Sequence, residues 1–132
     1  MLRGKAGGLW KEYALLRDGR GCKVQERFPE LNRKHSTIYQ VDHCFSRSIK
    51  ALFFETANST VICSNCNMSK GFKNEPVRIA VESIVEAREG SKTFEKLKGD
   101  ALHSRPFLPW KSVEWVEGKI SELEQKIREI QL

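Results

Sequence analysis

Apolar side chains recur at helical spacing near the start of the chain. The run LWKEYALLR, residues 9–17, places its apolar residues on one side of a predicted short helix. Asp18 and the glycines that follow it would end this helix. The next segment, residues 22–34, is polar and basic and contains a proline, so it is predicted to be a loop.

Two strand patterns and a helix pattern follow one another in the middle of the chain. Residues 36–41 are rich in β-branched and aromatic side chains and run straight into Asp42 and His43, and residues 60–62 form a second short strand pattern. Residues 63–71 are typical of a cysteine knuckle that opens a short helix. This order predicts a ββα unit.

The remainder of the chain is predicted to be helical. Pro76 opens a helix that Gly90 ends, and a shorter helix follows with Ser91 or Thr93 as its cap. Residues 104–109, which contain two prolines, are predicted to be a linker. The side chains expected to face inward are Val77, Ala80, Val81, Ile84 and Ala87 in the first helix, and Phe94, Leu97 and Ala101 in the second.

The last helix carries apolar residues at alternating spacings of three and four. These residues are Val113, Val116, Ile120, Leu123, Ile127 and Ile130. Such a heptad pattern, with β-branched residues at alternate positions, favours a parallel two-stranded coiled coil, and we expect a homodimer through this helix. The alternative is that the apolar stripe packs on the protein's own helices between residues 76 and 102, because three heptads containing Gly118 form only a marginal coiled coil.

The size and composition are those of one small globular unit. The chain has 132 residues, of which 39% are hydrophobic and 30% charged. The elements predict an α+β fold in which residues 1–73 form a basic core and residues 74–132 a helical extension of it. No segment resembles an export signal or is apolar enough to cross a bilayer, so we expect no membrane partner and a cytoplasmic location.

The positive charge is concentrated in the first part of the chain. The formal net charge is +6; residues 1–73 contain 13 Lys and Arg against 6 Asp and Glu, and residues 74–132 contain 10 against 11. Clustered cations of this kind favour binding to nucleic acid, because they neutralise its phosphates. The alternative is a solvated basic surface that keeps the protein soluble.

The residues around the ββα unit suit phosphodiester hydrolysis. This reaction needs an activated water and neutralisation of the phosphoryl charge. Asp42 offers an anionic oxygen and Asn67 a neutral carbonyl oxygen to Mg²⁺ or Mn²⁺, and His43 could take the proton from the attacking water. Taken singly, each has a simpler explanation: Asp-His dipeptides are common in surface turns, and Asn67 could merely cap its helix.

The stretch from Val41 to Gly71 resembles the HNH, or ββα-metal, nuclease family, whose pattern is Asp-His, then Asn, then Cys-x-x-Cys-Asn-x-x-Lys-Gly. Within that family, the sequence His-x-x-Ser-Arg at 43–47 and the helices that follow resemble the phage recombination nucleases of the NinG (Rap) group. The resemblance implies a ββα-metal core and a metal-dependent DNA endonuclease that cuts branched or junction DNA.

The resemblance also implies a role for each site residue. Asp42 and Asn67 would bind the catalytic Mg²⁺ or Mn²⁺, His43 would be the general base, and Asn58 would hold the loop that aims the histidine. Three cations would bind the flanking phosphates: Arg47, Lys70 and Lys73.

Four cysteines without an export signal favour reduced or metal-bound thiols. HNH domains of this type commonly carry two Cys-x-x-Cys knuckles around one structural Zn²⁺. Cys22, Cys63 and Cys66 would supply three ligands, but Gln25 stands where the fourth thiol is expected. Two residues could replace it: Cys44, which is otherwise a buried thiol, and His35, which is otherwise an exposed loop histidine.

Two other functions use the same features. A nicking endonuclease of phage DNA packaging or homing would share the chemistry and differ in its DNA substrate. A non-catalytic zinc-knuckle DNA-binding protein would explain the basic part and the cysteines, but it would leave Asp42, His43, Asn58 and Asn67 without a role.

Overall fold

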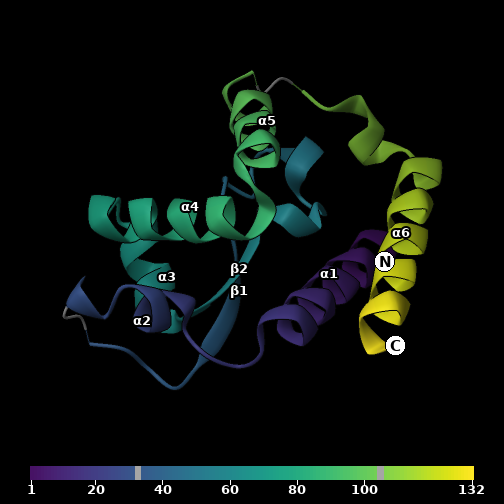
Figure 1. The fold of residues 1–132 in the computed structure, drawn as a ribbon. Coiled ribbons are helices and arrows are strands. Elements are labelled where there is room, and N and C mark those ends of the chain that lie inside the picture. The colour runs from purple at the N-terminus through teal and green to yellow at the C-terminus, as the bar shows by residue number, and fades with distance from the viewer. Residues whose placement is uncertain (32–33, 104–105) are drawn as a thin grey trace.

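The computed structural model of the chain describes residues 1–31, 34–103 and 106–132. In these residues six α-helices surround one two-stranded sheet, which confirms the predicted α+β class (Figure 1). The elements are α1 (Leu2–Asp18), α2 (Lys23–Arg27), β1 (Tyr39–His43), β2 (Ser59–Cys63), α3 (Ser64–Gly71), α4 (Glu75–Glu89), α5 (Ser91–Leu102) and α6 (Val113–Gln131). No helix in the described ranges is long and apolar enough to span a membrane.

The two strands and α3 form a continuous ββα unit at the centre. Strands β1 and β2 are antiparallel, with Asp42 opposite Thr60 and His43 opposite Ser59. Every residue of β2 is buried, and α3 begins directly after it. The thiol of Cys63 caps α3 by accepting a hydrogen bond from the backbone N–H of Cys66 at 3.4 Å. Both predicted strands and the predicted knuckle helix are therefore present.

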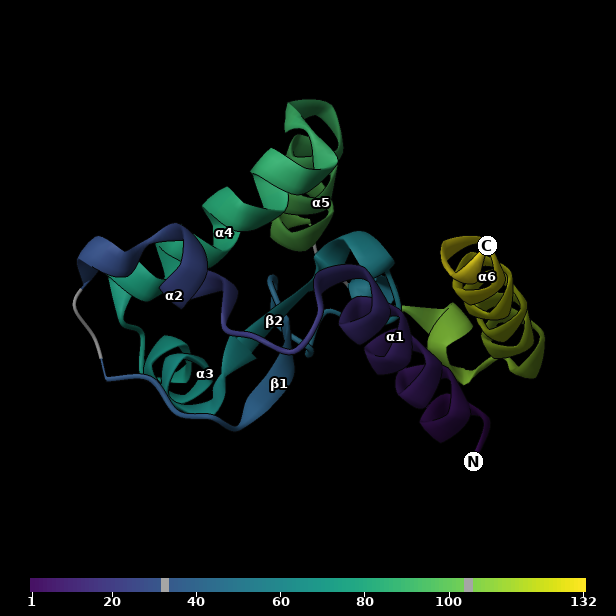
Figure 2. The same cartoon turned by 60° about the horizontal axis from the view of Figure 1, so that its bottom comes forward.

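Helix α1 begins seven residues earlier than its apolar pattern predicts. Its first two turns contain three glycines, which disfavour a helix in isolation. They are held helical by tertiary packing: Ala6, Trp10 and Ala14 are at most 1% exposed, and these positions, four residues apart, form the face that meets α6 and the sheet. Figure 2 shows α1 and α6 side by side, away from α2, α3 and α4.

The segment predicted as a loop after α1 contains the short helix α2 and a single 3₁₀ turn at Pro29–Leu31. Val24 of α2 is completely buried and belongs to a core cluster with α4, which stabilises a helix that the polar sequence does not indicate. The prediction of a loop was wrong for residues 23–27.

Both predicted helices are present, α4 with its predicted bounds and α5 beginning at Ser91. Asn74 caps α4, and the N-cap of α5 is Gly90 (φ 92°) instead of Ser91 or Thr93. Ala87 of α4, which was expected to face inward, is exposed. Val85 is buried instead. Of the predicted linker, residues 104–105 lie outside the described residues, and Leu108–Lys111 form a 3₁₀ helix.

The apolar stripe of α6 is covered within the chain. Val116, Ile120 and Leu123 are buried in a cluster with Trp10 and Ala6 of α1, whereas the end positions of the heptad pattern, Val113 and Ile130, are 59% and 38% exposed. The stripe thus packs on α1, and not on the helices between residues 76 and 102. The sequence pattern predicts a covered face without saying which element covers it.

Candidate metal centre and active site

Three cysteines and one histidine meet at the starts of α2 and α3. Cys22 is the N-cap of α2, Cys63 is the N-cap of α3, and Cys66 lies in the first turn of α3. His35, from the segment before β1, lies against all three thiols. The four ligand atoms lie within 4.8 Å of one another, so this Cys₃His group could hold a metal such as zinc.

Four of the six distances between ligand atoms in the group are close to those of a tetrahedral zinc site. The Nδ1 atom of His35 lies 3.4 Å from the thiol of Cys66, 3.5 Å from that of Cys63 and 3.7 Å from that of Cys22. The thiols of Cys22 and Cys66 are 3.8 Å apart. Tetrahedral zinc with ordinary Zn–S and Zn–N bonds places neighbouring ligand atoms about 3.5–3.8 Å apart. The group is therefore preorganised for one ion.

The fourth ligand position belongs to His35, and not to Cys44. The Cys44 thiol is outside the group and lies in the apolar core, where burial raises its pKa to about 12 and keeps it protonated. At Cys63, burial raises the pKa, but the backbone N–H groups of Ser36 and Cys66 outweigh it and lower the pKa to about 6, which favours the thiolate that binds metal.

A basic cleft of about 870 Å³ lies between the end of β1 and α3. The predicted site residues on its lining are Asp42, His43, Arg47, Asn67, Lys70 and Lys73. Arg47 and Lys73 are exposed, and Lys73 has a positive φ of 60° in the turn between α3 and α4. Residues that are up to 31 positions apart along the chain thus share one concave surface.

Asp42 faces α3 from the buried side of β1. Its side chain is 10% exposed, and its Oδ2 atom lies 3.2 Å from the Nζ of Lys70. Burial raises the pKa of the Asp42 carboxyl above its ordinary value, against the effect of that ion pair. Oδ2 is buried, and its partner among the described residues is the Lys70 ammonium, so a bound cation would share this oxygen with Lys70.

Asn67 and Lys70 lie on the side of α3 that lines the cleft with Asp42. The amide nitrogen of Asn67 donates a hydrogen bond to Oε1 of Gln40 at 2.7 Å, which fixes the orientation of the amide and leaves its oxygen as an acceptor. Lys70 donates to the carbonyl of His43 at 3.0 Å as well as pairing with Asp42. Lys70 is therefore engaged inside the site, unlike the exposed Arg47 and Lys73.

The His43 imidazole contacts different elements from Asp42, because adjacent side chains on a strand point to opposite faces. Its Nε2 atom lies 3.0 Å from the carbonyl of Phe53, which can only accept, so Nε2 carries the proton. Burial lowers the pKa of His43 to about 4, so the ring is neutral near pH 7. In this tautomer Nδ1 holds the free electron pair.

Asn58 joins the two ends of the segment between the strands. Its Oδ1 accepts the backbone N–H of Phe45 at 2.7 Å, and its Nδ2 donates to the carbonyls of Phe45 and Leu52 at 3.1 and 3.2 Å. The side chain is completely buried. Every hydrogen-bonding atom of this amide group thus holds the backbone that follows His43.

The sequence pattern did not indicate three residues that orient the site. Gln40 orients Asn67, Phe53 binds His43 through its carbonyl, and the indole of Trp10 stacks on the His43 ring. Gln40 could have been found by strand periodicity, because it lies two residues before Asp42 on the same face. The other two lie in segments distant in sequence, and no local signal marks them.

Comparison of the chain with models of protein families, with curated proteins and with solved structures finds no match. The interpretation of the site therefore rests on its geometry and on the resemblance of its motif.

Proposed function

We propose that the chain is a metal-dependent DNA endonuclease of the HNH type that hydrolyses phosphodiester bonds. The observation that carries the proposal is the basic cleft at the junction of β1 and α3, whose lining includes Asp42, Asn67 and His43. Asn58 holds the segment that follows His43, which is the task that the family resemblance implies for this residue.

Asp42 and Asn67 would hold the catalytic Mg²⁺ or Mn²⁺. The carboxylate of Asp42, which pairs with Lys70, and the oriented amide of Asn67 are oxygen donors of the type that hard divalent cations bind. The bound ion would supply charge neutralisation at the phosphoryl oxygens and at the leaving oxygen.

His43 would act as the general base through Nδ1. The hydrogen bond from Nε2 to the Phe53 carbonyl fixes the tautomer, and a neutral imidazole at the edge of a cleft can take a proton from water. Arg47 and Lys73, which are exposed on the cleft wall, would bind phosphates on either side of the cut. Lys70 would hold the Asp42 carboxylate and the His43 backbone in place.

The Cys₃His group would hold a structural Zn²⁺ that stabilises the start of α3, next to the cleft. The four ligands join the start of α2, the segment before β1 and the start of α3. Because Asn67 directly follows the ligand Cys66, the ion would fix the helix turn that presents Asn67 to the cleft.

Cleavage of supercoiled plasmid with added Mg²⁺ or Mn²⁺ tests the proposal. We expect metal-dependent cleavage that a chelator stops, and we expect His43→Ala to lose about two to four orders of magnitude in rate while DNA binding persists. The matched control is His103→Ala, because His103 is exposed at the end of α5 and distant from the cleft lining. DNA binding without any metal-dependent cleavage would contradict the proposal and would favour the non-catalytic DNA-binding function.

Asp42→Ala and Asn67→Ala test the division of roles. Since both residues would act through the metal, their loss of rate should become smaller at high Mn²⁺ concentration, whereas the loss caused by His43→Ala should not. An identical response of all three variants would contradict this assignment.

The DNA substrate that we propose is branched, as the resemblance to the recombination nucleases implies. A panel containing a four-way junction, a flap and a linear duplex of equal length measures this preference. Preferential cleavage of linear or nicked sites would favour the packaging or homing type of nicking enzyme.

A further inference from the structure

The ring of His43 contacts two aromatic side chains, one from α1 and one from the segment between the two strands. The indole of Trp10 in α1 stacks on the imidazole with ring centroids 4.1 Å apart and planes inclined by 15°. Phe53 lies on the ring at 4.5 Å with a tilt of 47°. An exposed histidine on a strand end has none of these constraints, so the contacts with α1 and Phe53 decide how this ring is held.

The stacking and the hydrogen bond restrict different motions of the ring. Stacking on Trp10 fixes the plane of the imidazole, but it permits a half-turn about the Cβ–Cγ bond that exchanges Nδ1 with Cδ2 and Nε2 with Cε1. The hydrogen bond from Nε2 to the Phe53 carbonyl, 3.0 Å long, selects one of these two orientations. Together they leave Nδ1 as the one basic atom, in one position.

Trp10 is itself held in place. It is 1% exposed, and its indole N–H donates to the carbonyl of Glu55 at 2.8 Å. The carboxylate of Glu55 pairs with Lys119 of α6 at 2.9 Å, and Ile120 and Leu123 of α6 belong to the same buried cluster as Trp10. The indole therefore has a fixed plane before any substrate binds.

We infer that Trp10 is a positioning residue for His43, which fixes the imidazole plane so that Nδ1 is aligned for proton transfer. The inference rests on the proposed function, in which His43 is the general base. In this inference, α1 carries the indole of Trp10 that stacks on His43, and α6 packs against that indole. Misplacement of a catalytic group by about 1 Å can reduce a rate about a hundredfold.

Variants of Trp10 and a matched control separate positioning from general stability. Trp10→Leu removes the stacking face, Trp10→Phe keeps an aromatic face, and Trp115→Leu removes an indole that contacts Phe54, Phe107 and Trp110 but not His43. We expect Trp10→Leu to lower kcat about tenfold to a hundredfold with KM for DNA unchanged. We expect Trp10→Phe to restore most of kcat and Trp115→Leu to leave it unchanged, all measured below the melting temperature of each variant.

The double variant distinguishes positioning of His43 from a purely structural role of Trp10 by its residual cleavage rate. In a His43→Ala background, Trp10→Leu should change the residual rate no further, because the group through which it acts is absent. An equal loss in both backgrounds, or a loss from Trp10→Phe as large as that from Trp10→Leu, would overturn the inference.

Proton NMR tests the positioning independently of cleavage. The indole ring current should shift the ring protons of His43 upfield from those of His35 and His103, and Trp10→Leu should reduce that shift to the part contributed by Phe53; His43→Ala assigns the signal. If the wild type shows this shift but does not cleave DNA, the proposed function fails while the positioning stands. If the shift is absent, the inference fails whatever the activity.

Discussion

At the scale of single residues, polar side chains hydrogen-bond to the backbone where it is neither α-helix nor strand. The segment between the two strands has backbone hydrogen bonds in its short turns, and Asn58 adds three bonds from one buried amide. Arg17 and Arg88 bind the carbonyls at its end, at Thr56 and Ser59 and at Ala57 and Ser59. These side chains set the shape of the backbone next to His43.

Asn58→Ala should therefore be strongly destabilising. The substitution leaves one buried N–H and two carbonyls without their partner, and we expect a loss of about 2–4 kcal/mol in the free energy of unfolding. Asn74→Ala is the control, because it removes only the cap of α4 and should cost about 1 kcal/mol. Urea denaturation measures both, and equal losses would contradict the role of Asn58 in holding the segment.

The proposed zinc binding also depends on single residues. Elemental analysis of the purified protein should find about one zinc per chain, and His35→Ala should lose it and lower the melting temperature. Cys44→Ser should keep the zinc, because its thiol is outside the ligand group. Retention of zinc by His35→Ala would show that His35 is not the fourth ligand.

At the scale of elements, helix α1 packs between α6 and the end of β1 and contacts both. One face carries small residues, Ala6 and Ala14, which allow close packing, and Trp10 reaches from between them to the His43 ring. Helix α6 covers this arrangement from outside. The appended helices thus belong to the same packed unit as the strands.

The packing of α6 on α1 predicts a position-dependent effect of alanine substitution. Ile120→Ala should lower the free energy of unfolding by about 2–4 kcal/mol, because it leaves a cavity in the buried cluster. Val113→Ala, at a position that is 59% exposed, should change it by about 0.5 kcal/mol or less. Thermal or urea unfolding compares the two, and similar effects would contradict the packing.

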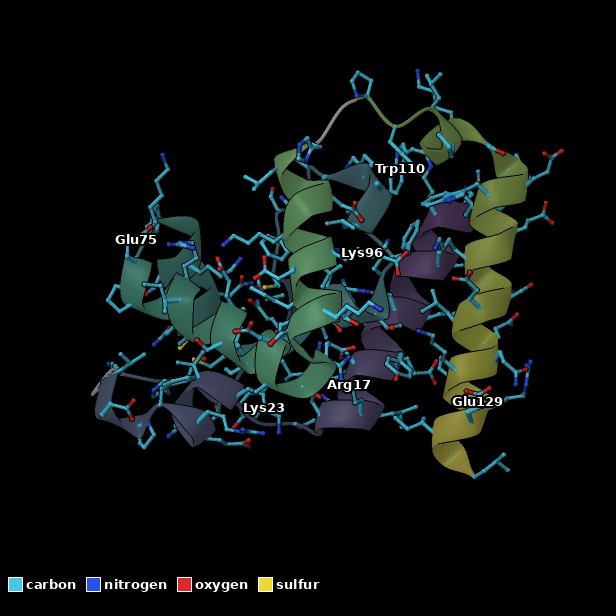
Figure 3. The ribbon with its side chains drawn as sticks, turned by 45° about the horizontal axis from the view of Figure 1, so that its top comes forward. Arg17, Lys23, Glu75, Lys96, Trp110 and Glu129 are labelled. Carbon is cyan, nitrogen blue, oxygen red and sulfur yellow. The ribbon has the colours of Figure 1, made fainter. Side chains whose placement is uncertain are left out.

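At the scale of the whole molecule, a half-buried ionic cluster joins the end of α1 to α4. Asp18 accepts bonds from Arg17 at 2.7 and 2.9 Å and lies 3.7 Å from Arg88, and both arginines also bind the segment before β2 (Figure 3 labels Arg17). Burial raises the pKa of Asp18, but Arg17 and Arg88 outweigh it, so the pKa lies below its ordinary value. The cluster therefore stabilises the fold only while Asp18 is ionised.

This pKa shift predicts an acid-sensitive contribution to stability. Because the folded pKa is lower than the unfolded value of about 3.9, the contribution is complete well above pH 4 and is lost as the pH falls through the unfolded and then the folded pKa. Asp18→Asn should be less stable at neutral pH and should lose less stability on acidification than the wild type. Asp100→Asn, on the exposed side of α5, is the control. Parallel pH dependences of unfolding for Asp18→Asn and the wild type would contradict the prediction.

The dimer predicted from the heptad pattern stays a prediction, and the packing changes how it is tested. A dimer through α6 would have to use the exposed end positions, since the central ones contact α1. Sedimentation should then find a wild-type dimer that Val113→Asp with Ile130→Asp dissociates. A monomeric wild type would contradict the dimer and agree with the use of the stripe inside the chain.

The sequence by itself determined what depends on local pattern. The strand, strand and helix order and the bounds of α4 follow from propensities and caps that act over a few residues. The motif also indicated three of the four members of the Cys₃His group, because the knuckle and Cys22 have characteristic spacing. His35 stayed one of two candidates, since a ligand 13 residues from Cys22 has no local signature.

Only the tertiary structure decided which distant surfaces meet. It selected His35 over Cys44, placed α6 on α1 and extended α1 through its glycines, because burial of Trp10 and Ala6 outweighs weak helix propensity. It also placed Asp42 and His43 on opposite faces of β1, one against Lys70 and the other against Trp10. Contacts between segments far apart in the chain depend on the shape of the whole packed core, which short-range pattern does not contain.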